Sequence, residues 1–164
     1  MSDVANLGAI RPPRVYLAAI VTGVLLQLAM PLAFLPRGMA AGAVFVIGAV
    51  ALLWYSVALF RAAGTPVPAR KPTTAIVRTG PYRFSRNPIY LAYSLCQLGI
   101  AIWLNSLWLL ATLGVAVALM HFVVIRREEE YLEQRFGEEY LRYKASVRRW
   151  LDWRTRRPQG SPES

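Results

Sequence analysis

The sequence predicts an all-α integral membrane protein of about four transmembrane helices, with a cytoplasmic loop and a C-terminal amphipathic helix gathered at one end. Of its 164 residues, 55% are hydrophobic and only 17% are charged, a balance typical of a small membrane domain. The hydrophobic residues form four uncharged stretches, whereas the basic residues lie between and after them. The first observation predicts the fold class, and the second predicts its orientation.

The first two apolar stretches are each long enough to cross a bilayer. They cover residues 15–35 and 39–60, and at about 1.5 Å rise per residue such helices cover the roughly 30 Å hydrocarbon core. The first run is longer than that of a signal peptide, and a second span follows it closely, which favours a retained helix. The stretches 88–104 and 106–125 meet at Asn105 and are predicted to form two helices joined by a very tight turn. The third is short for a span, so we expect it to tilt little or to lie in locally thinned bilayer.

Charge asymmetry predicts the orientation. The loop from 61 to 86 holds six basic residues and no acid, whereas the turn at Asn105 has no charge. Under the positive-inside rule, both termini and the long loop are cytoplasmic, in keeping with an even number of spans, and the expected location is a bacterial inner membrane. The chain is thereby divided into a cytoplasmic N-terminus (1–14), a four-helix membrane region (15–125) that includes the loop 61–87, a cytoplasmic helical segment (126–154) and a flexible tail (155–164).

The composition also bears on partners. The net charge of +10 is compatible with nucleic-acid binding, but basic residues beside membrane spans set the topology and attract anionic lipid headgroups in any case. We therefore expect anionic membrane lipids, and no nucleic acid, as partners. The lone Cys96 permits no internal disulfide, and no cluster of His, Cys or carboxylates has the spacing of a metal site.

The long loop is restricted by its prolines and leads into the third helix. Residues 66, 68, 72 and 81 are proline, which prevents helix, and Thr79-Gly80-Pro81 predicts a turn. Pro88 falls in the first turn of the third helix, where a missing N–H does no harm. Arg86 and Asn87 then lie at the helix N-terminus, where free N–H groups and the helix dipole favour an anion.

The segment after the fourth span is predicted to be an amphipathic helix on the membrane surface. Gly137 is expected to loosen or bend it, and Trp150 and Trp153 are expected to anchor it at the interface. Its apolar stripe has spacings of four, four, three and four. The stripe residues are Leu132, Phe136, Tyr140, Tyr143 and Val147.

Two acids, Glu128 and Glu129, directly follow the last span. Beside anionic lipid headgroups, two negative charges are not favourable unless a cation lies close to them. One interpretation is ion pairing with Arg126, Arg127 or Arg83. The other is that one carboxylate receives an ammonium or ribose hydroxyls from a ligand. Together with the anion site at the third helix, such a cation site could hold a zwitterion.

Two runs of sequence carry a family resemblance. They are VRTGPYRFSRNPIYLA at 77–92 and EEEYLEQRFGEEYLRYKASVRRWL at 128–151. In order and spacing they resemble the integral membrane methyltransferases of the isoprenylcysteine carboxyl methyltransferase and phospholipid methyltransferase group, over about residues 65–151. The resemblance implies S-adenosyl-L-methionine as methyl donor, S-adenosyl-L-homocysteine as product, and a lipid or other hydrophobic acceptor from the bilayer. It also implies a cofactor site, closed by the C-terminal helix, on Thr74, Ala75, Ile76, Val77, Tyr82, Arg86, Asn87, Pro88, Ile89, Tyr90 and Glu128, with Glu129 in support.

Three positions depart from the family pattern. The family's histidine is Asn87 here, a frequent glycine is Ala92, and an arginine of the isoprenylcysteine branch is Val124. Because that arginine would suit a substrate carboxylate, its absence argues against carboxyl O-methylation. A phospholipid amine, a thiol and a hydrophobic carboxylate all stay open as acceptors.

His121 is the candidate catalytic residue. It is the only histidine in the chain, and it lies two turns before Glu128, on roughly the same face of a regular helix. An amine acceptor must lose a proton before it attacks, and either His121 or interfacial water would receive it; packing is the alternative role of the ring. Two other function classes also stay open, a sterol-reductase-like membrane oxidoreductase and a non-enzymatic membrane scaffold.

Overall fold

The computed structural model of the protein describes residues 11–34, 39–64 and 75–151, and within these ranges it contains helices and no strand. The fold class predicted from the sequence is therefore confirmed. A 3₁₀ turn, η2 (Gly80–Arg83), and a π-helical turn, η3 (Met120–Ile125), accompany the α-helices. The α-helices are α1 (Pro12–Ala29), α2 (Met39–Ala62), α3 (Pro88–Trp103), α4 (Leu107–Leu119), α5 (Arg126–Phe136) and α6 (Glu138–Ser146).

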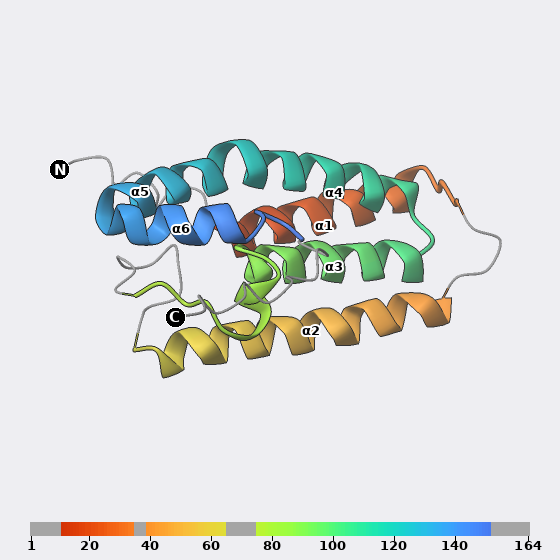
Figure 1. Cartoon of the computed structure of the whole chain (residues 1–164). Helices are drawn as coiled ribbons and strands as arrows, with labels where there is room; N and C mark the ends of the chain where they lie inside the picture. Colours follow the sequence, from red (N-terminus) through yellow and green to blue (C-terminus); the bar gives the residue numbers. More distant parts are fainter. Residues whose placement is uncertain (1–10, 35–38, 65–74, 152–164) are drawn as a thin grey trace.

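The four apolar helices lie side by side, and α5 and α6 stand at one end of the bundle (Figure 1). Helix α3 packs against α2 on one side and α4 on the other, while α1 packs mainly against α4. The contact between α2 and α3 is very close, because a Cβ on Gly42 would lie 2.5 Å from the carbonyl oxygen of Gly99. A glycine at position 42 is therefore required for this packing.

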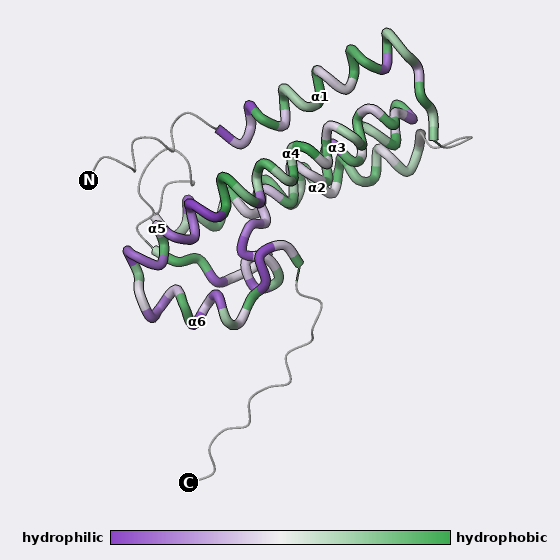
Figure 2. Tube along the Cα trace, turned by 90° about the horizontal axis from the view of Figure 1, so that it is seen from above, coloured by the Kyte–Doolittle hydropathy of each residue, from purple (hydrophilic) through white to green (hydrophobic). Residues whose placement is uncertain are grey.

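Three helices within the described residues are long and apolar enough to cross a membrane, and α3 is a shorter apolar helix. Large hydrophobic side chains such as Leu25, Val44 and Trp54 are exposed on the outside of the bundle, where lipid would cover them. Figure 2 shows that hydrophobic residues dominate the bundle, whereas many of the hydrophilic ones gather around α5 and α6. The protein is an integral membrane protein; that α3 crosses the whole bilayer stays a prediction.

The first helix differs from its predicted bounds. It begins at Pro12 and ends at Ala29, and of the stretch predicted to continue to residue 35 the described residues 30–34 are not helical. The cause is Pro31, whose ring disfavours the helical conformation of the residue before it. Met30 accordingly has φ −141° and ψ 86°.

The extended chain after α1 is hydrogen-bonded to the tight turn between α3 and α4. Leu107 N donates to the Leu32 carbonyl at 2.9 Å, and Phe34 N donates to Asn105 Oδ1 at 3.0 Å. Trp108 Nε1 donates to the Met30 carbonyl at 2.8 Å. The predicted turn at Asn105 is confirmed, with a positive φ of 48° at that residue.

Gly137 breaks the predicted C-terminal helix in two. Its φ of 51° and ψ of −128° are outside the helical range, and α6 folds back beside α5 (Figure 1). The residues predicted as one stripe do gather, but from both helices, and Ile76 of the loop packs with them. The predicted bend is thus a full reversal of direction, which brings residues 147–151, named the strap below, back towards α3.

Candidate functional site

The site rests on an apolar cluster at the end of the bundle where α5 and α6 lie. This cluster joins α1, α2, η2, α3, α4 and η3, and Tyr82 and Tyr90 are part of it. The Tyr82 ring meets the edge of Phe60 at a centroid distance of 5.1 Å. Because the elements that carry Tyr82 and Tyr90 contribute to one cluster with α1, α2, α4 and η3, these two tyrosines have a common apolar support. The buried members are Tyr16, Phe60, Tyr82, Ile89, Tyr90, Ala116, Met120, Val124 and Ile125.

Glu128 and Tyr90, both predicted to bind the cofactor, are in direct contact. Tyr90 Oη donates to Glu128 Oε1 at 2.6 Å. Helix α4, the turn η3 and helix α5 follow one another without a break and form one rod, the α4–α5 rod. Its apolar part ends at Ile125, so Glu128 lies beyond the span predicted over residues 106–125. Burial raises the pKa of Glu128 to about 7 and the charge of Glu129 adds to this, against the Tyr90 hydrogen bond, which lowers it. A cation bound here would therefore favour the ionised carboxylate.

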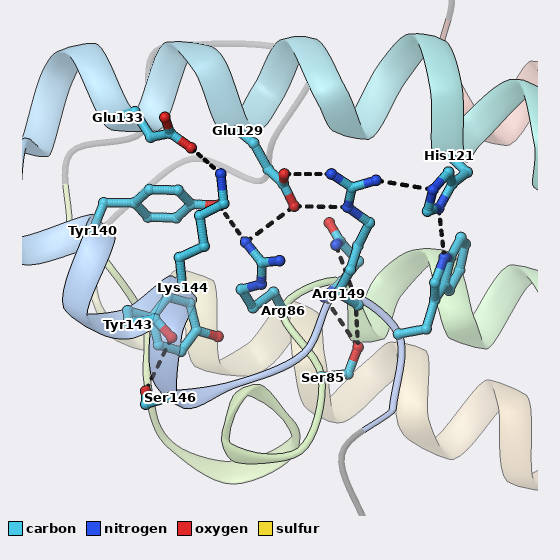
Figure 3. A network of polar contacts seen from close by, with 12 residues as sticks. Ser85, Arg86, His121, Glu129, Glu133, Tyr140, Tyr143, Lys144, Ser146 and Arg149 are labelled. Atoms are coloured by element: carbon cyan, nitrogen blue, oxygen red, sulfur yellow. Dashed lines mark hydrogen bonds and ion pairs between the residues drawn. The ribbon is translucent and has the colours of Figure 1, made fainter.

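Glu129 is shared by two arginines (Figure 3). Arg86 Nη1 lies 3.0 Å from its Oε1, and Arg149 reaches both oxygens, with Nε at 2.9 Å and Nη2 at 2.6 Å. Glu129 is only 5% exposed. Two guanidinium groups around one carboxylate leave an excess of positive charge in a poorly solvated place.

The ion pairs of the two acids differ from those considered in the sequence. Glu129 pairs with Arg86 and Arg149, whereas Arg126 pairs with Glu130 on the outer face of α5. Helical geometry explains the difference, because Arg126 and Glu130 are i, i+4 neighbours and Glu129 points inward. Arg149 is not among the partners predicted from the sequence, although Arg148 and Arg149 form a basic pair at the end of the second run.

The N-terminus of α3 is met by the strap. Helix α3 begins at Pro88, as predicted, with Asn87 as the N-cap residue. Arg86 N donates to the Arg148 carbonyl at 3.0 Å, and Asn87 Nδ2 donates to the Arg149 carbonyl at 3.0 Å. The negative ends of two carbonyl groups thus lie where an anion was predicted. Asn87 supplies a side-chain donor at the position of the family's histidine.

The remaining predicted cofactor residues fall into three groups. Thr74 lies outside the described residues. Ile76 and Val77 pack against the apolar clusters, and Ala75 is partly buried. Pro88 and Ile89 are buried at the start of α3.

Two of the predicted cofactor residues fit a polar ligand in a specific way. Tyr82 Oη and Arg86 Nε are buried and have no hydrogen-bond partner among the described residues. An unpaired buried polar atom is costly, so each is a place where a ligand atom would be favourable. A separate cavity of about 530 Å³ adjoins the strap, and of the predicted cofactor residues only Arg86 lines it.

His121 contacts the strap. Its Nε2 lies 3.0 Å from Arg149 Nη1, and its Nδ1 lies 3.0 Å from Trp150 Nε1, which donates to it. The indole of Trp150 is half-buried and nearly parallel to the imidazole ring; its predicted role as an interfacial anchor stays a prediction. Trp153 lies outside the described residues.

The π-helical turn explains why His121 is not aligned with Glu128. In a regular helix, His121 and Glu128 would be about 20° apart around the axis, and His121 and Glu129 about 80° apart. The turn η3 (Met120–Ile125) accommodates about one extra residue, because its hydrogen bonds run from i to i+5. The angle to Glu129 therefore shrinks to about 20° and that to Glu128 grows to about 120°. Arg149 can then reach both His121 and Glu129 (Figure 3), and the predicted common face with Glu128 is wrong.

Comparison with known proteins gives three partial relatives. An uncharacterized protein of Haemophilus influenzae is 46% identical over 65 residues, which are 38% of this chain and 100% of that protein. The cobalt-zinc-cadmium resistance protein CzcN of Cupriavidus metallidurans is 40% identical over 78 residues, which are 46% of this chain and 36% of that protein. The nickel-cobalt-cadmium resistance protein NccN of Alcaligenes xylosoxydans xylosoxydans is 37% identical over 68 residues, which are 42% of this chain and 32% of that protein.

The matches thus span about a third of the length of the two resistance proteins. No solved structure matches the chain. No group of three or more His, Cys, Asp or Glu within the described ranges could hold a metal ion. The profile of one family does match, over residues 37–139, a range that runs from the start of α2 to the start of α6 and includes the Tyr90–Glu128 contact. By this match the chain belongs to the phospholipid methyltransferase family.

Proposed function

We propose that the protein transfers a methyl group from S-adenosyl-L-methionine to a lipophilic acceptor that enters from the bilayer. The family match over residues 37–139 supports the reaction class. The observation that carries the site is the Tyr90–Glu128 hydrogen bond, because it joins the two runs of sequence that carry the family resemblance. Both termini are proposed to be cytoplasmic, in a bacterial inner membrane with anionic lipids as neighbours, because the basic residues gather beside this site.

Each proposed cofactor residue has a role that follows from its chemistry. Glu128 binds the ammonium group or ribose hydroxyls, and Tyr90 orients its carboxylate. Tyr82 Oη and Arg86 Nε offer polar atoms that lack partners among the described residues, and the excess positive charge around Arg86 suits the carboxylate of the amino-acid part. When bound, the cofactor supplies an electrophilic methyl group on a sulfonium.

The protein's main task in this reaction is positioning. Methyl transfer is an in-line displacement, and holding two reactants in line contributes about 7 to 11 kcal/mol to lowering a barrier. The apolar cluster in which Tyr82 and Tyr90 are packed provides a support for this. A phospholipid amine or a thiol is the proposed acceptor, because Val124 offers no cation for a carboxylate. The base proposed for its proton is either His121, which would first have to give up a contact with the strap, or interfacial water.

The decisive test is binding of S-adenosyl-L-homocysteine to the purified protein, measured by calorimetry. We expect Glu128→Ala to weaken binding about ten- to hundred-fold, because a charge-assisted hydrogen bond is worth about 1.5 to 3 kcal/mol. Glu133→Ala is the matched control, since Glu133 lies further along α5 and pairs with Lys144. Equal effects of the two substitutions would count against the assignment of Glu128.

The same purified protein separates the other function classes. Binding of NADPH in place of the homocysteine product would favour a membrane oxidoreductase, and binding of neither would favour a scaffold. The acceptor itself is found by incubating native membranes with labelled methyl donor and identifying the labelled lipid.

A further inference from the structure

The strap (147–151) is fixed from two sides. On the side of α3, its carbonyl groups at Arg148 and Arg149 accept hydrogen bonds from Arg86 N and Asn87 Nδ2, both at 3.0 Å. On the side of the α4–α5 rod, the side chains of Arg149 and Trp150 contact His121. The strap therefore connects the two elements that carry Tyr90 and Glu128.

The hydrogen-bond chemistry of His121 is unusual. Both of its ring nitrogens face groups that can only donate, Trp150 Nε1 at Nδ1 and Arg149 Nη1 at Nε2. A neutral imidazole has one acceptor nitrogen, so it can fully accept only one of the two hydrogen bonds at a time. A protonated imidazole can accept neither. The surroundings of the ring thus favour an acceptor of hydrogen bonds and leave no free lone pair for the proton of a substrate.

From these contacts we propose that His121 is a positioning residue: it anchors the strap, and the strap fixes the spacing between Tyr90 and Glu128. This role rests on the proposed function, since the spacing matters for binding the methyl donor. In this role His121 takes no proton from the acceptor, and the proton of an amine or thiol leaves to interfacial water. The π-helical turn contributes to this anchoring, because it places His121 and Glu129 on the same face of the α4–α5 rod, where Arg149 contacts both.

The first experiment measures S-adenosyl-L-homocysteine affinity of the full chain in detergent. His121→Ala and Trp150→Phe each remove one side of the same hydrogen bond, so each is expected to weaken binding about 2- to 10-fold. The double variant should bind no more weakly than the weaker single variant, because the interaction is lost only once. Trp108→Phe is the control: it removes an indole hydrogen bond to Met30 at the opposite end of the bundle and should leave the affinity unchanged. Unchanged affinity in both His121→Ala and Trp150→Phe overturns the proposal.

The second experiment separates positioning from proton transfer. With labelled methyl donor and native membranes, the pH profile of turnover should keep its shape in His121→Ala, because the ring takes no proton. Loss of the acidic limb of the profile, with turnover lower by about 10² to 10⁴ and affinity unchanged, would identify a base and overturn the proposal.

The third experiment does not depend on the methyl donor. The amide of Arg86 donates to the Arg148 carbonyl, on the far side of the strap from His121. If His121 anchors the strap, hydrogen exchange at the Arg86 amide should be faster than in the wild-type protein in both His121→Ala and Trp150→Phe, and the increase should be about the same in the two variants. Unchanged exchange in both variants overturns the proposal, even if the wild-type protein binds no homocysteine product and the proposed function fails. Should His121→Ala not fold, Trp150→Phe alone decides the outcome.

Discussion

Glu129 is a single carboxylate that two guanidinium groups share. The side chain of Arg86 is 9% exposed and that of Arg149 is 26% exposed, so the cluster is poorly screened by water. The sequence marked Glu129 as unusual because an acid after a membrane span needs a cation. It did not identify the cations, because Arg149 lies 20 residues further on, beyond a reversal of the chain. Tyr90 and Glu128 were each predicted to bind the cofactor, since both fall on the family motif, but the hydrogen bond between them was not predicted.

We expect Glu129→Gln to lower the free energy of unfolding by about 3 to 5 kcal/mol, because the poorly exposed guanidinium of Arg86 and the partly exposed one of Arg149 lose their counter-charge. The measurement is unfolding of the purified protein in mixed micelles. Glu130→Gln is the matched control, since Glu130 and Arg126 are 57% and 72% exposed, and such surface pairs contribute about 0 to 1 kcal/mol. A loss of similar size in the two variants would contradict the structural role of Glu129.

Two irregular turns determine how the C-terminal elements meet the bundle. Gly137 reverses the chain between α5 and α6, and η3 rotates α5 relative to α4. The sequence indicated the first, because glycine interrupts a helical stripe. The second has no local signal, since MHFVVI at 120–125 reads as ordinary helix. Its His121 contacts the strap and its Met120, Val124 and Ile125 are buried in the core, and such long-range contacts are not visible in local propensity.

Gly137→Ala is expected to reduce stability by about 1 to 3 kcal/mol, because φ +51° with ψ −128° is a conformation that residues with a Cβ rarely adopt. The penalty comes from the backbone alone, since a Cβ at position 137 meets nothing within 4 Å. Gly48→Ala in the middle of α2 is the control: its Cβ also meets nothing within 4 Å, and its backbone is helical. Unfolding of the two variants in micelles is compared, and a neutral Gly137→Ala would show that the turn does not need glycine.

The molecule as a whole has a polar end and an apolar body. The apolar part was predictable from composition, because burial in lipid requires only hydrophobicity and length. How deeply α3 enters the membrane was not predictable from composition. A 16-residue helix is held by its neighbours α2 and α4 as much as by lipid. The unwound chain after α1 was also missed. Its polar backbone groups are accommodated by the α3–α4 turn, and that partner is 71 residues away for Phe34.

The orientation of the whole molecule is tested by cysteine labelling in a Cys96→Ser background. An impermeant maleimide should modify Ala75→Cys only from the cytoplasmic side, because the loop from 61 to 86 carries six basic residues. Ala33→Cys, exposed in the segment after α1 at the other end of the bundle, should react only from the outer side. Labelling of position 75 from outside would reverse the assigned topology.

The π-helical turn between α4 and α5 also has a consequence for how the gene can change. Because the turn accommodates about one extra residue, deleting one residue there, such as the exposed Phe122, would allow a regular helix and still leave Glu129 about 20° from His121. Glu129 would then stay on the side that Arg86 and Arg149 reach. Inserting one further residue would instead add about 100° between His121 and Glu129 and turn the carboxylate away from both arginines. A scan of insertions and deletions would therefore find a single deletion in this segment tolerated and a single insertion harmful.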